Sequence, residues 1–247
     1  YWYFGDRAGI NFKTGTARAD TNGQINTSEG CASISDSKTG DLLFYTDGVS
    51  VWNYKHELMT GGTGLAGGYS STQSALIVPV PEADKKYYIF TSPDLTNNKP
   101  ITTTSTQFSI VSLKNPGGEV TSLNETLISG TSEKLAGTID CSGKGYWVLT
   151  HLRYSNDFYA FHVTKSGVEP PVISHYDAPS TDHVGGYMKI SPNGKKVAIA
   201  SVMGKSFLAL FDFDTKTGKV SNPMLLGDTI NRNRKYYGLT FSPDNSK

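Results

Sequence analysis

The feature that most constrains this chain is a short pattern that recurs at equal intervals. A strand, a tight turn and a second strand begin at Ile139 (IDCSGKGYWVL), at Ile190 (ISPNGKKVAIA) and at Phe241 (FSPDNSK), so both steps are 51 residues long. Hairpins that recur at roughly 40 to 50 residues are typical of β-propeller blades, in which each four-stranded sheet packs against its neighbours. The sequence therefore predicts an all-β propeller fold before it indicates any function.

The composition supports short strands joined by turns. The chain has 247 residues, with 26 Gly, 14 Tyr and only 18% charged residues, which favours strands over amphipathic helices. Lys and Arg (23) nearly balance Asp and Glu (22), so the basic excess of nucleic-acid-binding proteins is missing. No apolar run approaches the roughly 18 residues of a membrane-spanning helix. We expect a single domain over residues 1–247 that neither binds nucleic acid nor spans a membrane.

Apolar runs and turn signals divide the chain into four-stranded blades. We expect blades at residues 30–68, 69–130, 131–180 and 181–230, with the start of a further blade at 236–247. The aromatic segment 1–12 is expected to close the last blade, or to form an independent edge strand. About four to five blades are too few for a ring of the commonest size, because seven blades at this period need about 350 residues. We therefore expect the chain to be a portion of a larger, seven-bladed propeller.

The same signals place individual strands. The second strands of the four blades are predicted to begin at residues 42, 87, 146 and 197. Asp47-Gly48 lies between two apolar runs of the first blade and predicts a hairpin, because its turn type needs positive φ. In the third blade the first strand is expected at residues 137–140. The first strand of the fifth blade is expected to begin at Tyr237.

Three groups of residues resemble a known family. They are Trp2-Tyr3-Phe4-Gly5 with residues 8–12 (AGINF), residues 29–36 (EGCASISD) with 40–48 (GDLLFYTDG) and 51–53 (VWN), and residues 71–75 (STQSA) with 77–79 (IVP). Together they resemble the N-terminal propeller region of large secreted Bacteroidetes surface proteins associated with gliding motility and type IX secretion. The resemblance covers most of the first two blades. It implies export, display on or release from the cell surface, and further domains in the same polypeptide, but no catalytic residues.

The resemblance also suggests one modification site. Asp228-Thr229-Ile230 looks like the Asp-Ser/Thr-apolar pattern of Bacteroidetes O-glycosylation. Thr229 is therefore the candidate glycosylation site.

The usual motifs of catalysis and metal binding are absent. No H-E-x-x-H, G-x-S-x-G, Walker loop or C-x-x-C occurs, and the five histidines have no ligand-like spacing. Residues 212–218 (DFDTKTG) contain two carboxylates, but a turn in which Asp and Thr bond the local backbone explains them better than a calcium loop does. Cys31 and Cys141 are expected at opposite ends of the channel, which argues against a disulfide. We expect no catalytic residue, no metal and no cofactor.

The candidate binding residues come from loops that should meet at one end of a propeller. The loops that lead into the first strands and those that join the second and third strands lie at the same end, where binding is common. The candidates are Glu29, Asp47, Gln73, Asp94, Lys134, Arg153, His183, Arg234 and Tyr236. Their mixed charge, together with Tyr and Arg, suits a polysaccharide or a polar protein surface. The alternative is that they are solvated rim residues, while the turns at the opposite end set blade geometry only.

Two functions remain open at this point. The first is a non-catalytic cell-surface module that scaffolds or binds, with a cell-surface polysaccharide or an outer-membrane or secretion-system protein as its partner. The second is a secreted carbohydrate-active enzyme, a glycosidase or lyase, which requires a pair of carboxylates about 5 to 10 Å apart or an arginine cluster. Ser35-Asp36 with Gly40 resembles the Asp-box turn of sialidases, but the aromatic anchor falls elsewhere.

Overall fold

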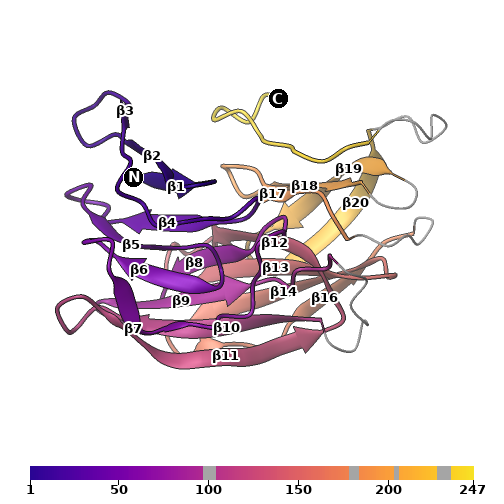
Figure 1. Cartoon of the computed structure of the whole chain (residues 1–247). Coiled ribbons are helices and arrows are strands. Elements are labelled where there is room, and N and C mark those ends of the chain that lie inside the picture. The colour runs from indigo at the N-terminus through magenta and orange to yellow at the C-terminus, as the bar shows by residue number, and fades with distance from the viewer. Residues whose placement is uncertain (97–103, 178–183, 203–205, 227–234) are drawn as a thin grey trace. The chain divides into compact units, whose positions relative to one another are not determined.

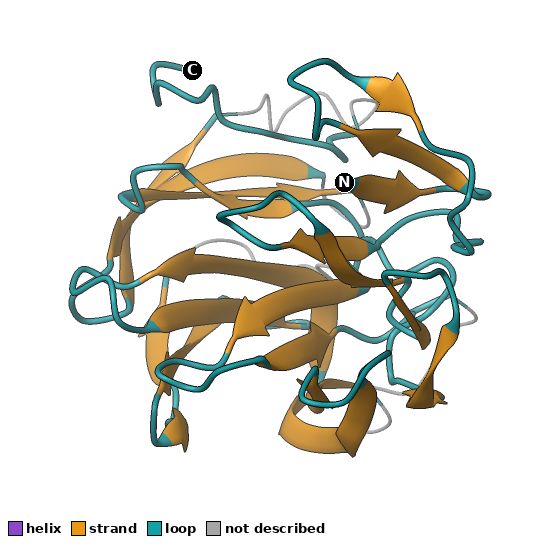
Figure 2. Ribbon diagram, turned by 90° about the vertical axis from the view of Figure 1, so that its left-hand side faces the viewer, coloured by secondary structure: helices purple, strands orange, loops and turns teal. Residues whose placement is uncertain are grey.

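The described part of the chain is built from strands and loops alone. The computed structural model describes residues 1–96, 104–177, 184–202, 206–226 and 235–247. These residues contain no helix (Figure 2), and hence none that is long and apolar enough to cross a membrane. Cys31 and Cys141 are both free thiols. The prediction of an all-β fold is confirmed.

The chain divides into two compact units. The first contains Tyr1–Pro79, Asp84–Lys99 and Ser105–Ser129, and the second contains Val80–Ala83, Pro100–Thr104 and Gly130–Lys247. Each unit has its own sheets and its own apolar core.

Two antiparallel meanders of four strands form most of the first unit (Figure 1). The strands of the first meander are β4 (Ala32–Ser35), β5 (Leu42–Thr46), β6 (Ser50–Asn53) and β7 (Leu58–Thr63). Those of the second are β8 (Ala75–Pro79), β9 (Lys86–Thr91), β10 (Ser105–Ser112) and β11 (Glu119–Ser129). A parallel pairing of Thr60 with Glu119 joins β7 to β11 and makes the two meanders one eight-stranded sheet.

The two meanders of the first unit share one apolar core. Phe44 and Val51 of the first meander are fully buried and belong to the same cluster as Ile89 and Val111 of the second. Alternate residues of a strand point to opposite faces, so each meander contributes one apolar face to this cluster. Because of this packing, turns from both meanders lie close together at one end of the strands.

The N-terminal arm forms a small sheet of its own. Strands β1 (Trp2–Phe4), β2 (Ala8–Asn11) and β3 (Arg18–Ala19) pair antiparallel in that order. Tyr3 is buried and its ring stacks on that of Tyr45 in β5, with centroids 4.5 Å apart. Residues 1–12 thus contribute two strands to a three-stranded sheet that packs against the first meander.

The second unit contains a second pair of meanders. One consists of β12 (Thr131–Ile139), β13 (Tyr146–Leu152), β14 (Asp157–Thr164), β15 (Gly167–Val168) and β16 (Val172–His175), in which β14 pairs with both β15 and β16. The other consists of β17 (Met188–Ile190), β18 (Lys196–Ser201), β19 (Phe207–Asp214) and β20 (Lys219–Leu225). Phe158 of β14 and Phe211 of β19 are almost fully buried and meet edge to face at 4.9 Å. Their contact lies in a core that both meanders share.

Two strand predictions differ from the structure. Strand β12, the first strand of the meander at residues 131–175, begins at Thr131 instead of residue 137. Its early residues still pair with β13, although the register is irregular between Thr131 and Leu135. Residues 236–247 contain a turn but no strand. The backbone carbonyl of Tyr237 accepts a hydrogen bond from the N–H of Tyr187 at 2.8 Å, but this pairing does not extend into a ladder within the described residues.

The interpretation of residues 212–218 as a turn is confirmed. Asp214 accepts hydrogen bonds from the backbone N–H of Lys216 and the hydroxyl of Thr217, and Gly218 has a φ of +74°. Asp212 lies apart from this turn and forms an ion pair with Lys196 at 2.5 Å.

Candidate functional site

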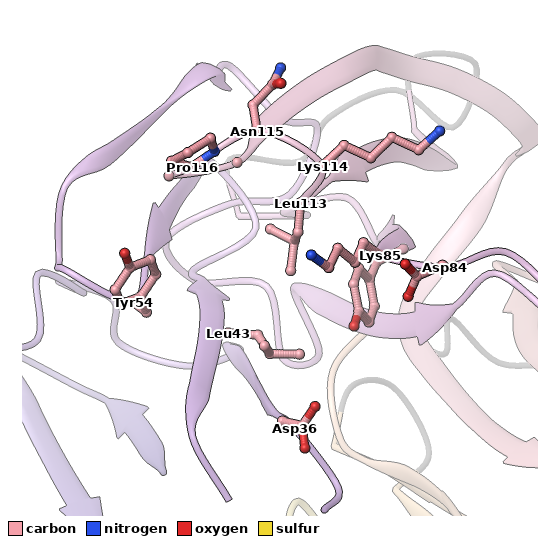
Figure 3. Close-up of a pocket in the computed structure, with 12 residues that line it drawn as sticks. Asp36, Leu43, Tyr54, Asp84, Lys85, Leu113, Lys114, Asn115 and Pro116 are labelled. Atoms are coloured by element: carbon pink, nitrogen blue, oxygen red, sulfur yellow. The ribbon is translucent and has the colours of Figure 1, made fainter. Parts of the chain in front are cut away.

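A cavity lies in the first unit, at the end of the meanders where first strands turn into second strands and third strands into fourth (Figure 3). Its volume is about 410 Å³, within the range of small-ligand pockets. Strands β5 and β9 and four turns contribute to it. The lining residues are Asp36, Leu43, Tyr54, Asp84, Lys85, Tyr87 and the segment 113–118.

The floor of the cavity is apolar. Leu43 and Leu113 are partly buried and pack against the shared core of the two meanders. The ring of Tyr87 meets Phe44 of that core edge to face at 5.3 Å. The ring of Tyr54 is half exposed, at 50%. The cavity therefore combines an apolar base with an accessible aromatic side chain at its edge.

The loops around the cavity are fixed by backbone contacts. The N–H of Leu113 donates to the carbonyl of Lys85 at 2.8 Å, which ties the β8–β9 turn to the β10–β11 turn. Lys85 itself has a φ of +56°, a left-handed conformation that is costly for a residue other than glycine. Gly118 has a φ of +73°, and a Cβ there would lie 2.8 Å from Leu113 and from Met59. The turn can close over the floor of the cavity because position 118 is glycine.

The charged groups of the cavity differ in their surroundings. The backbone N–H groups of Thr39 and Lys38 donate to Asp36 Oδ1, both at 2.8 Å, and lower the pKa of this carboxyl. Burial raises the pKa of Tyr87, and the negative charges of Asp36 and Asp84 raise it further. The general acid of a glycosidase needs a raised carboxyl pKa. Asp36 is shifted in the opposite direction, which suits an ionised hydrogen-bond acceptor.

The two lysines of the cavity point in different directions. In Figure 3 the ammonium of Lys85 points toward the middle of the cavity, between Leu43 and Leu113, whereas the side chain of Lys114 extends away from it. Lys85 can therefore meet a ligand on the cavity floor, and Lys114 faces outward.

Some of the residues predicted from the sequence gather in a different part of the first unit. Glu29 and Asp94 meet through Ser70, whose hydroxyl donates to Glu29 at 3.4 Å and whose backbone N–H donates to Asp94 at 3.2 Å. The carbonyl of Gln73 accepts a hydrogen bond from the hydroxyl of Ser92 at 2.9 Å. These contacts lie near the start of β8, away from the turns that form the cavity.

The remaining predicted residues of the first unit and of the tail have local roles. Asp47 accepts hydrogen bonds from the backbone N–H groups of Val49 and Ser50, and so shapes its own hairpin turn. The backbone N–H of Tyr236 donates to Ser206 Oγ at 3.0 Å.

Two predicted residues of the second unit are buried. Lys134 is fully buried within β12, and its ammonium donates to the carbonyls of Gly185 and Gly186 at 2.9 and 2.8 Å. Arg153 is 8% exposed and donates to the hydroxyl of Tyr154 at 3.1 Å. Lys134 was expected in a loop, and the early start of β12 is the reason that it lies inside. His183, Arg234 and Thr229 fall outside the described residues.

The cavity residues were missed because the sequence offers only ordinary turn chemistry there. Leu43 and Leu113 have the pattern of core residues, and Asp84, Lys85 and the Asn-Pro-Gly-Gly segment 115–118 have that of turns. The sequence offered one signal for this site. Ser35-Asp36 with Gly40 resembles an Asp-box turn, and Asp36 does line the cavity.

Comparisons with known proteins define no family for this chain. No family model matches it, and no curated protein sequence matches it either. Among solved structures, a candidate 6-phosphogluconolactonase from Bacteroides uniformis is 15% identical with a TM-score of 0.45, over 92% of this chain and 71% of its own. AztD from Citrobacter koseri is 12% identical with a TM-score of 0.46, over 95% and 56%.

A third solved structure is an enzyme that acts on a polysaccharide. The exo-β-1,3-galactanase of Clostridium thermocellum is 13% identical with a TM-score of 0.47, over 90% of this chain and 52% of its own. At these identities and scores the comparisons assign neither a fold family nor an activity. The function has to be inferred from the site itself.

Proposed function

We propose that this chain is a non-catalytic, carbohydrate-binding module and that its four meanders are blades of a β-propeller. The observation that carries the proposal is the cavity of the first unit, in which an accessible tyrosine ring, an apolar floor, hydrogen-bond acceptors and an ammonium donor face one space. Sugars present both C–H faces and hydroxyl groups, so they need an apolar surface and hydrogen-bonding groups together. The cavity offers both.

The proposal includes a location and partners. We propose that the protein is exported and displayed at, or released from, the cell surface, where it binds a polysaccharide or a glycosylated outer-membrane component. The motivation is the resemblance of residues 29–53 and 71–79 to Bacteroidetes surface proteins. A binding module of this kind works together with other domains of its polypeptide.

A second candidate is a carbohydrate-active enzyme that uses the same cavity. The observation in its favour is that Asp36 and Asp84 both line the cavity and both act on the pKa of Tyr87. Against it stands the lowered pKa of Asp36, which makes this group a poor general acid. We therefore favour binding over hydrolysis.

The test is a glycan array followed by calorimetric titration of the best ligand. Replacement of Tyr54 by Ala is expected to weaken binding by about tenfold, because it removes the aromatic ring on which the sugar face packs. Tyr69→Ala is the matched control, because Tyr69 is similarly exposed (59%) but lies beside Ser70 and Glu29. Loss of binding in Tyr69→Ala with normal binding in Tyr54→Ala would reject the cavity as the site. Release of sugar products that Asp36→Asn abolishes would instead establish the enzyme.

A further inference from the structure

Lys85 is the charged group that the cavity presents most directly to a ligand. Its backbone is held left-handed and is anchored by the hydrogen bond from Leu113, so the turn that carries it has a defined shape. Its ammonium points toward the middle of the cavity (Figure 3). Within the described residues the ammonium makes no ion pair and no hydrogen bond.

The carboxylates of the cavity lie around this ammonium without neutralising it. Asp36 is engaged by the N–H groups of its own turn, and Figure 3 places it and Asp84 at the edges of the cavity. A ligand on the floor of the cavity therefore meets one positive charge at the centre and negative charges at the periphery. This arrangement offers one cationic partner at the centre, so it suits a ligand with a single negative charge placed there. A second negative charge, as in a phosphate ester, would find no cation to pair with and would be repelled by the peripheral carboxylates.

From this arrangement we infer that the preferred ligand is an acidic saccharide of the uronate type, whose sugar face packs on the apolar floor and on Tyr54 and whose carboxylate binds Lys85. The inference rests on the proposed function, since it names the substrate class of the same cavity. A hydrogen bond between an ammonium and a carboxylate is stronger than one between neutral groups. The peripheral carboxylates accept hydrogen bonds from sugar hydroxyls.

The experiment compares two ligands that differ in one group. A hexuronate oligosaccharide and its carboxyl-reduced, neutral counterpart are titrated against the wild-type chain and three variants. Wild type is expected to bind the acid about tenfold more tightly at low salt, and the preference is expected to shrink as salt rises because the charges are screened.

The variants assign the preference to one side chain. Lys85→Met keeps the length of the side chain and is expected to lose the preference, so that it binds the acid no more tightly than the neutral ligand. Lys85→Arg is expected to retain the preference. Lys114→Met is the matched control, because its side chain points out of the cavity, and it is expected to behave as wild type.

Each outcome has a distinct meaning. Equal affinity of the wild type for both ligands would overturn the inference and leave carbohydrate binding standing. A preference for the acid that survives in Lys85→Met but disappears in Lys114→Met would also overturn it. Absence of binding to both ligands and to every glycan of the array would reject the proposed function itself.

Discussion

At the scale of single residues, His162 connects three other side chains of the second unit. Its Nε2 lies 3.0 Å from Asp140 Oδ2 and its Nδ1 lies 3.4 Å from Glu169 Oε2, while the ring stacks on Trp147 at 4.4 Å. Burial raises the pKa of Asp140, but hydrogen bonds donated by Ser142 and His162 outweigh this and lower the pKa to about 2. The ionised form of Asp140 therefore stabilises the fold.

Replacement of Asp140 by Asn is expected to destabilise the protein in a pH-dependent way. Because the folded pKa is depressed, the contribution of Asp140 is fully present above its unfolded pKa of about 4 and is lost as the pH falls toward 2. We expect the free energy of unfolding to drop by about 1 to 2 kcal/mol at pH 7 and by much less near pH 2. Urea denaturation followed by tryptophan fluorescence measures both values. Asp177→Asn, at an exposed position, is the control, and an equal loss in the two variants at pH 7 would contradict this role of Asp140.

At the scale of elements, local sequence signals predict most strands and turns. The second strands begin at residues 42, 86, 146 and 196, and their predicted starts were 42, 87, 146 and 197. Strand alternation and turn residues are local properties, so one sequence suffices to find them. The clearest miss is non-local, because β12 is extended by an irregular pairing with β13. Residues 236–247 contain no strand although their turn matches the repeat.

The turn between β19 and β20 combines a local requirement, positive φ, with a non-local one, close approach to a ring of another strand. Gly218 has a φ of +74°, and a Cβ there would lie 2.4 Å from the ring of Trp147. Gly143 has a similar φ of +72° with open space around it. Alanine at 143 is expected to cost about 1 to 2 kcal/mol of unfolding free energy for the backbone alone. Alanine at 218 is expected to cost a further 1 to 3 kcal/mol or so, because it also overpacks against the ring. Thermal denaturation of both variants measures the difference, and equal melting temperatures would contradict the contact.

At the scale of the whole molecule, the sequence indicated the architecture far better than the site. The repeat predicted hairpins from spacing alone, and the structure has them at Ile139 and Ile190 but not at Phe241. The cavity arises because packing of two meanders places Tyr54 of one and Lys85 of the other around the same space, and no local pattern encodes that arrangement. Most of the binding residues predicted from the sequence belong to loops at the opposite ends of the strands, where Glu29 and Asp94 meet through Ser70.

The most direct test of the binding proposal is a crystal structure of the chain with a bound oligosaccharide from the glycan array. The account predicts electron density for the sugar in the cavity of the first unit, with a sugar face against Tyr54 and a polar group of the ligand within hydrogen-bonding distance of Lys85 Nζ. Density beside Glu29, Ser70 and Asp94 with an empty cavity would contradict the account.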